Sequence, residues 1–86
     1  MKTTKFKKLG TGDIFRFIDK ETAYLVCYGK HSIEGNNIIE ELERPAIISQ
    51  ITEAMMEREV IKYNVNEINY KAVEGGVIMS IKKFNS

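Results

Sequence analysis

A lone cysteine and a lone histidine are the side chains of this sequence best suited to nucleophilic or metal chemistry. Cys27 and His31 stand four residues apart, whereas a structural zinc site needs four nitrogen or sulfur ligands. Nothing in the sequence places His31 against the sulfur as a catalytic base would require. We therefore expect no metal site, no cofactor and no catalytic centre, and we predict that the protein is not an enzyme.

The stretch Gly10-Thr11-Gly12 contains the first two glycines of a phosphate-binding fingerprint. A dinucleotide-binding loop needs a third glycine three residues later and a helix after it. Phe15 occupies that position, and the residues that follow have the character of a strand. The stretch therefore predicts a turn that leads into a strand.

Acidic side chains gather in the middle of the chain. Residues 34–59 have a charge balance of −5, whereas residues 1–31 have +4 and residues 60–86 have +2. Both signs of charge keep a surface hydrated in the plainest interpretation. In the functional interpretation the acidic segment contacts a basic surface of a protein partner. The residues predicted to make that contact are Glu40, Glu41, Glu43, Glu53 and Glu57.

Lysines flank aromatic residues at both ends of the chain. If the two ends meet, they form a basic patch suited to phosphate contact and base stacking. The net charge is only +1, nucleic-acid-binding domains are usually more basic, and lysine-rich ends also serve as solubilising tails. Nucleic-acid binding is therefore the alternative function, carried by Lys5, Phe6, Lys7, Lys8, Lys82 and Lys83.

The length of 86 residues leaves room for one hydrophobic core, so a single domain over 1–86 is predicted. The apolar run at 23–28 is far shorter than the roughly 20 residues of a membrane span. The lysines at the start are not followed by the apolar segment of a signal peptide. A single cysteine suits a reducing compartment, and we expect a cytoplasmic protein without membrane contact.

Alternating apolar residues predict two β-hairpins. Residues 14–18 and 23–28 have strand character and are separated by a polar loop. Residues 68–73 and 77–81 alternate on either side of Gly75-Gly76, which is typical of a two-residue hairpin loop. With Glu74 opposite Val77, one apolar face of the second hairpin gathers Ile68, Tyr70, Ala72, Met79 and Ile81.

One amphipathic helix is predicted at about 45–59. Pro45 fits the first turn of a helix, and apolar residues follow at helical spacing: Ile47, Ile48, Ile51, Ala54 and Met55. Residues 38–43 fit a short strand or a helical turn. The expected fold class is α+β, with a curled, mainly antiparallel sheet of two hairpins. Ile47, Ile51 and Met55 are expected to pack the helix on the apolar face of the second hairpin.

The opening of the chain has a spaced pattern, Phe6-x-x-Leu9-x-x-Gly12-Asp13-x-Phe15-x-Phe17, followed by Tyr24-Leu25-Val26. This stretch resembles the start of short bacteriophage and mobile-element proteins, in which it enters an SH3-like small β-barrel. The resemblance implies a non-enzymatic protein that binds and disables a host protein. The helix expected before the last strands departs from a plain barrel. Exposed sheet edges leave a third alternative, a homodimer.

Overall fold

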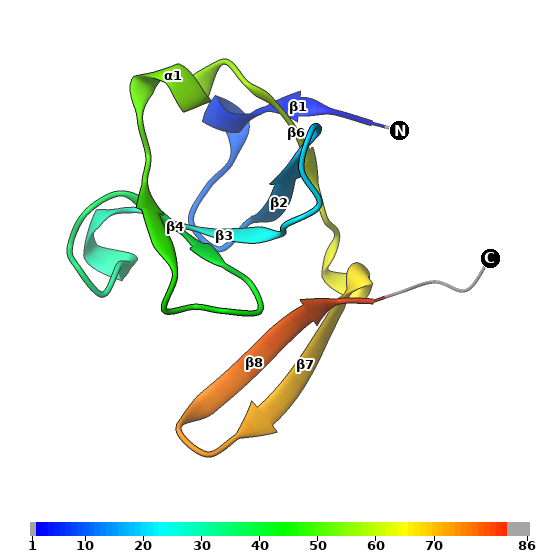
Figure 1. Ribbon diagram of the computed structural model, residues 1–86. Helices are drawn as coiled ribbons and strands as arrows, with labels where there is room; N and C mark the ends of the chain where they lie inside the picture. Colours follow the sequence, from blue (N-terminus) through cyan, green and yellow to red (C-terminus); the bar gives the residue numbers. More distant parts are fainter. Residues whose placement is uncertain (1, 83–86) are drawn as a thin grey trace.

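The computed structural model describes residues 2–82, and its regular secondary structure is mainly β-strand (Figure 1). The strands are β1 (Thr4–Lys5), β2 (Ile14–Phe17), β3 (Tyr24–Cys27), β4 (Ile38–Glu41), β5 (Ile48–Gln50), β6 (Glu59–Lys62), β7 (Ile68–Val73) and β8 (Gly76–Ile81). The helical pieces are the α-helix α1 (Glu53–Met56) and the 3-10 turns η1 (Phe6–Lys8), η2 (Gly29–His31) and η3 (Val65–Glu67).

Two antiparallel sheets are present in the described part of the chain. Strands β1 to β6 form the main sheet in the order β1-β6-β2-β3-β4-β5. Strands β7 and β8 form a separate sheet, the C-terminal hairpin. The chain thus has the expected small, mainly antiparallel architecture, with much less helix than expected.

The main sheet curls around an aromatic core. Strand β6 returns to pair with β2, which places Phe17 opposite Val60. Phe6, Phe15 and Val60 have no exposed surface, and the rings of Phe6 and Phe15 meet edge to face with centroids 5.2 Å apart. Helix α1 packs against η1 where the chain crosses from β5 to β6 (Figure 1). The core therefore holds both edges of the curled sheet together.

Strands β2 and β3 form the predicted N-terminal hairpin, with Ile14 opposite Leu25. The glycine-rich stretch before it is the predicted turn. The Asp13 carboxylate accepts a hydrogen bond from the Gly10 amide at 2.8 Å, and Gly12 has a φ of 92°, which glycine adopts without steric cost. This turn delivers β2 to the core.

Of the helix predicted over 45–59, only the single turn of α1, residues 53–56, is helical. Pro45 lies inside a turn in which the Ile47 amide donates to the Arg44 carbonyl at 2.9 Å. Such a turn accepts the same fixed φ of proline as the first turn of a helix. Residues 48–50 instead form β5 on the edge of the main sheet, with Ile39 opposite Ser49. The open question about residues 38–43 is also answered, because 38–41 form strand β4.

The C-terminal hairpin is confirmed in a different register. Val73 lies opposite Gly76, and Tyr70 lies opposite Met79, so the pairing differs by two residues from that expected with Glu74 opposite Val77. The predicted apolar face is kept, because only a shift of the register by an odd number of residues moves side chains to the other face. Gly75, with a φ of 90°, supplies the loop conformation that favours glycine.

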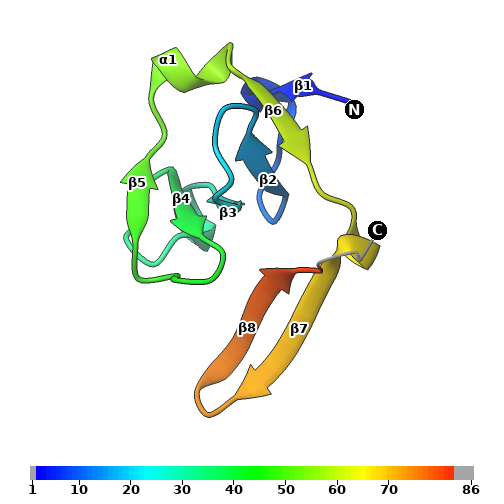
Figure 2. The same cartoon turned by 45° about the vertical axis from the view of Figure 1, so that its right-hand side comes forward.

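The packing predicted for this face is wrong. The hairpin contacts the main sheet through Ile68, with Met79 and Ile81 beside it, against Ile14 and Leu42. The expected partners lie elsewhere, since Ile51 and Met55 pack on the core of the main sheet, and Ile47 is exposed. Figure 2 shows the hairpin projecting from the end of β6, away from α1.

Candidate functional site

A hollow of about 550 Å³ lies where the C-terminal hairpin meets the main sheet. Its floor is apolar and is made by Ala23, Leu42 and Ile81, which belong to the cluster that docks the hairpin. The rim is charged and carries three glutamates and one arginine, namely Glu21, Glu41, Glu43 and Arg44. An apolar floor with a few polar groups at the rim is the usual composition of a binding pocket.

The rim has an excess of negative charge. The Arg44 guanidinium donates to Oε1 of Glu41 at 2.7 Å from Nη2 and 3.1 Å from Nε. Glu21 and Glu43 are exposed and take part in none of the ion pairs found within residues 2–82. The two unpaired carboxylates leave the hollow attractive to a cation, because like charges at the mouth of a hollow add their fields.

Tyr63 lies at the centre of this region. Besides the main hollow it lines a second one beside Lys20 and Glu21, with a volume of about 490 Å³. It also lines a third, of about 200 Å³, beside Tyr70. The Tyr63 amide donates to the Ile14 carbonyl at 2.8 Å, which fixes the backbone at this point. A half-buried tyrosine combines apolar contact area with a polar tip, which is why tyrosine is frequent at the centre of interfaces.

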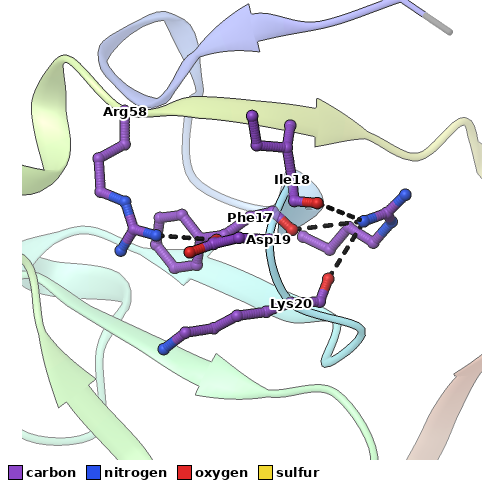
Figure 3. A network of polar contacts seen from close by, with 6 residues as sticks. Phe17, Ile18, Asp19, Lys20 and Arg58 are labelled. Atoms are coloured by element: carbon purple, nitrogen blue, oxygen red, sulfur yellow. Dashed lines mark hydrogen bonds and ion pairs between the residues drawn. The ribbon is translucent and has the colours of Figure 1, made fainter.

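Two arginines hold the loop that supplies Glu21 (Figure 3). Nη1 of Arg16 donates to the backbone carbonyls of Phe17, Ile18 and Lys20 at 3.4, 3.4 and 3.1 Å. Arg58 donates to Oδ1 of Asp19 at 3.0 Å and lies over the ring of Phe17. These contacts hold the backbone of the loop just before Glu21, which reduces the entropy that this part of the loop loses on binding.

The structure divides the acidic residues predicted to bind a protein. Glu41 and Glu43 reach the hollow. Glu40 lies on β4 between Leu25 and Ile48, and Glu53 is exposed at the start of α1. Sequence reasoning missed Glu21 and Tyr63 as members of the site. The polar loop after β2 was a signal for Glu21, but only the sheet topology brings that loop beside the turn after β4.

Glu57 is held by the basic residues of the alternative site. Its two carboxylate oxygens accept hydrogen bonds from Lys5 at 2.8 Å and from Lys7 at 2.7 Å. These bonds lower the pKa of Glu57 to about 2 and raise the pKa of Lys5. One member of the acidic set is therefore paired with two members of the basic set.

The residues predicted to bind nucleic acid do not form one patch within residues 2–82. Phe6 is fully buried in the core and offers no face to a base. Strand β1 pairs with the start of β6, whereas the Lys82 amide binds the Glu67 carbonyl beyond the other end of β6. Lys8 is exposed, and Lys83 lies outside the described residues.

The groups considered for metal or nucleophilic chemistry stay apart from the hollow. Residues 2–82 contain no cluster of three or more His, Cys, Asp or Glu side chains able to hold a metal ion. Cys27 is buried on β3, and this burial raises the pKa of its thiol. A thiol with a raised pKa is a weak nucleophile at neutral pH, since the thiolate is the reactive form.

No family model, curated protein or solved structure matches this chain. Among the described residues, no helix has the length and apolar character needed to cross a membrane.

Proposed function

We propose that the protein is a small, non-enzymatic binding domain that holds a basic segment of a partner protein in the hollow beside Tyr63. The observation that carries this proposal is the composition of the hollow, an apolar floor under a rim with three glutamates and one arginine. A segment that alternates Lys or Arg with aliphatic residues suits such a surface, because its cations meet the rim while its apolar side chains cover the half-buried Ala23 and Ile81.

The resemblance at the N-terminus supports a phage or mobile-element origin and a host protein as the partner. The strand order adds support for an SH3-like small barrel. Strand β6 returns to β2 after the single turn of α1, and β2 to β5 follow one another as neighbours. In this proposal the C-terminal hairpin is an addition to that barrel, and the hollow lies at the junction. The unpaired Cys27 fits the cytoplasm, where such a host target would be met.

The test is a titration followed by amide chemical shifts. The probe is a capped synthetic peptide of alternating lysine and leucine, with a glutamate–leucine peptide as the reference. We expect the lysine peptide to shift the amides of Leu42, Tyr63 and Ile81, and added salt to weaken its binding. The double substitution Glu41→Gln and Glu43→Gln should reduce its affinity by about tenfold. Its control, Glu34→Gln with Glu53→Gln, removes the same charge outside the hollow.

Two results would overturn the proposal. One is equal loss of affinity in both double variants, which would mean that net charge rather than the hollow attracts the peptide. The other is salt-sensitive binding of labelled DNA or RNA that is unchanged by the substitutions at Glu41 and Glu43. That second result would promote the alternative function, which stays a prediction based on Lys8 and the other lysines.

A further inference from the structure

The C-terminal hairpin is attached to the rest of the molecule at one end only. At that end Ile68 is 4% exposed and is packed with Met79 and Ile81. Towards the loop the apolar side chains are in solvent, with Tyr70 57%, Val77 55% and Ile78 43% exposed. Both views show the loop end projecting clear of the main sheet (Figures 1 and 2). A strand pair rarely stands alone in water with apolar side chains on both faces.

The outer edge of β8 is an open edge without protection. Within residues 2–82 the hairpin is a sheet of its own, so β8 pairs with β7 and with no further strand. Its six residues, Gly76 to Ile81, contain no charged residue and no proline. Natural edge strands usually carry lysine, proline or a bulge that prevents pairing with another chain. Strand β7, by contrast, carries Lys71.

We infer that β8 pairs with β8 of a second copy of this chain, antiparallel and about a two-fold axis beside Ile78. A neutral, self-complementary edge favours an identical strand over a charged partner, and a two-fold axis brings the same surface from both copies together. In antiparallel pairing, residues directly opposite share one face of the sheet. Ile78 then meets its own copy, and Val77 meets Met79. The apolar face that carries Tyr70, Val77 and Met79 continues across four strands.

This pairing also matches charges at its two ends. With Ile78 on the axis, Glu74 of one copy comes beside Lys82 of the other, and the same contact repeats by symmetry. Glu74 is exposed in the hairpin loop and Lys82 follows β8. Neither belongs to an ion pair within residues 2–82. The only charged groups that flank the β8 edge in the described chain thus have opposite signs at opposite ends.

The experiment is sedimentation equilibrium of the full chain over a wide range of concentrations. The native sequence should show a monomer–dimer equilibrium. Ile78→Lys places two lysines opposite each other on the axis and should leave only monomer. Its matched control is Ile33→Lys, which changes an isoleucine that is 91% exposed in the loop before β4 and should dimerise like the native chain. Ile78→Cys should form a disulfide-linked dimer on oxidation, since Cys27 is buried.

A charge exchange tests the pairing independently if Ile78→Lys fails to fold. Glu74→Lys and Lys82→Glu should each weaken the dimer several-fold, because each creates two like-charge contacts. The combined variant should regain the native affinity. A native chain that stays monomeric at every concentration overturns the inference. So does equal dimerisation of Ile78→Lys and Ile33→Lys, or a combined variant no tighter than either single one.

Discussion

The guanidinium of Arg58 lies 4.0 Å from the centre of the Phe17 ring. Phe17 is 3% exposed and belongs to the core of the main sheet. Arg58 therefore covers one side of that core. The same guanidinium binds Asp19 at 3.0 Å, which ties the end of α1 to the loop after β2. The contact thus joins the core to the loop that supplies Glu21 to the hollow.

Replacing Arg58 should therefore destabilise the fold. Arg58→Ala removes the cation–π contact and uncovers the ring, and we expect a loss of about 1 kcal/mol in the free energy of unfolding. Arg58→Lys keeps the charge but loses the planar stacking on the ring. Its free energy of unfolding should therefore lie between those of the native chain and of Arg58→Ala. The measurement is urea denaturation. Asp19→Ala should have a smaller effect, because exposed ion pairs contribute little. Equal stability of Arg58→Ala and the native chain would contradict this role.

Glu57 makes the stability of the fold depend on pH in acid. Its folded pKa of about 2 lies below the ordinary value of 4.5, so folding favours the charged carboxylate. The stabilisation is present above about pH 4.5 and is lost as the pH falls towards 2. Glu57→Gln should flatten the pH dependence of the urea midpoint in that window, and its difference from the native chain should vanish near pH 2.

The pKa itself can be followed by the carboxyl carbon shift of Glu57. In the native chain the midpoint should be close to 2. Replacing Lys5 and Lys7 together by alanine should return it towards 4.5, because the hydrogen bonds from these lysines are the main cause of the lowered pKa. A midpoint unaffected by the double substitution would show that the lysines do not hold Glu57 in solution.

The strands and turns with local signals could be predicted from the sequence, and the elements set by distant partners could not. Two hairpins, β2–β3 and β7–β8, have local signals. Each combines strand-forming residues on both sides with turn-forming residues in its loop. Residues 45–59 satisfy helical spacing and strand preference at once. The free edge of β4 favours the strand, because Ile48 to Gln50 pair with that edge as β5.

The candidate functional residues also depend on distant partners that the sequence could not reveal. The lysines Lys5 and Lys7 fit a phosphate-binding end of the chain by residue type. The pairing of β1 with β6 instead brings them to Glu57, 52 and 50 positions later in the chain. Phe6 between them is the first residue of η1, and its side chain is buried in the core. The hollow is built from four separate segments, and none of them has a sequence signature of its own.

Gly12 should be the less replaceable of the two glycines before β2. Its φ of 92° is a conformation that other residues adopt only with strain, so Gly12→Ala should lower the free energy of unfolding by about 1 kcal/mol. Gly10 has no such φ, and a Cβ there would meet only Asp13 Oδ2 at 4.0 Å. Gly10→Ala is the control and should be close to neutral. Equal midpoints in thermal unfolding would contradict the difference.

Ile68 should control the docking of the C-terminal hairpin separately from the folding of the main sheet. Its side chain is 4% exposed and forms one buried cluster with Ile14 and Leu42. Ile68→Ala removes most of that contact, a change that costs about 2–5 kcal/mol at a fully packed site. We expect the amides of β7 and β8 to lose hydrogen-exchange protection while those of β2 and β3 keep theirs, because the two sheets share no strand.

The same variant links docking to binding. An undocked hairpin withdraws Ile81 from the floor of the hollow, so Ile68→Ala should lose affinity for the lysine–leucine peptide even though Glu41 and Glu43 are intact. The matched variant Val65→Ala changes an apolar residue that is 78% exposed next to the hairpin and should leave both exchange and binding unchanged. Loss of protection in β2 and β3 together with β7 and β8 would instead mean that the chain unfolds as one cooperative unit, with the hairpin part of it.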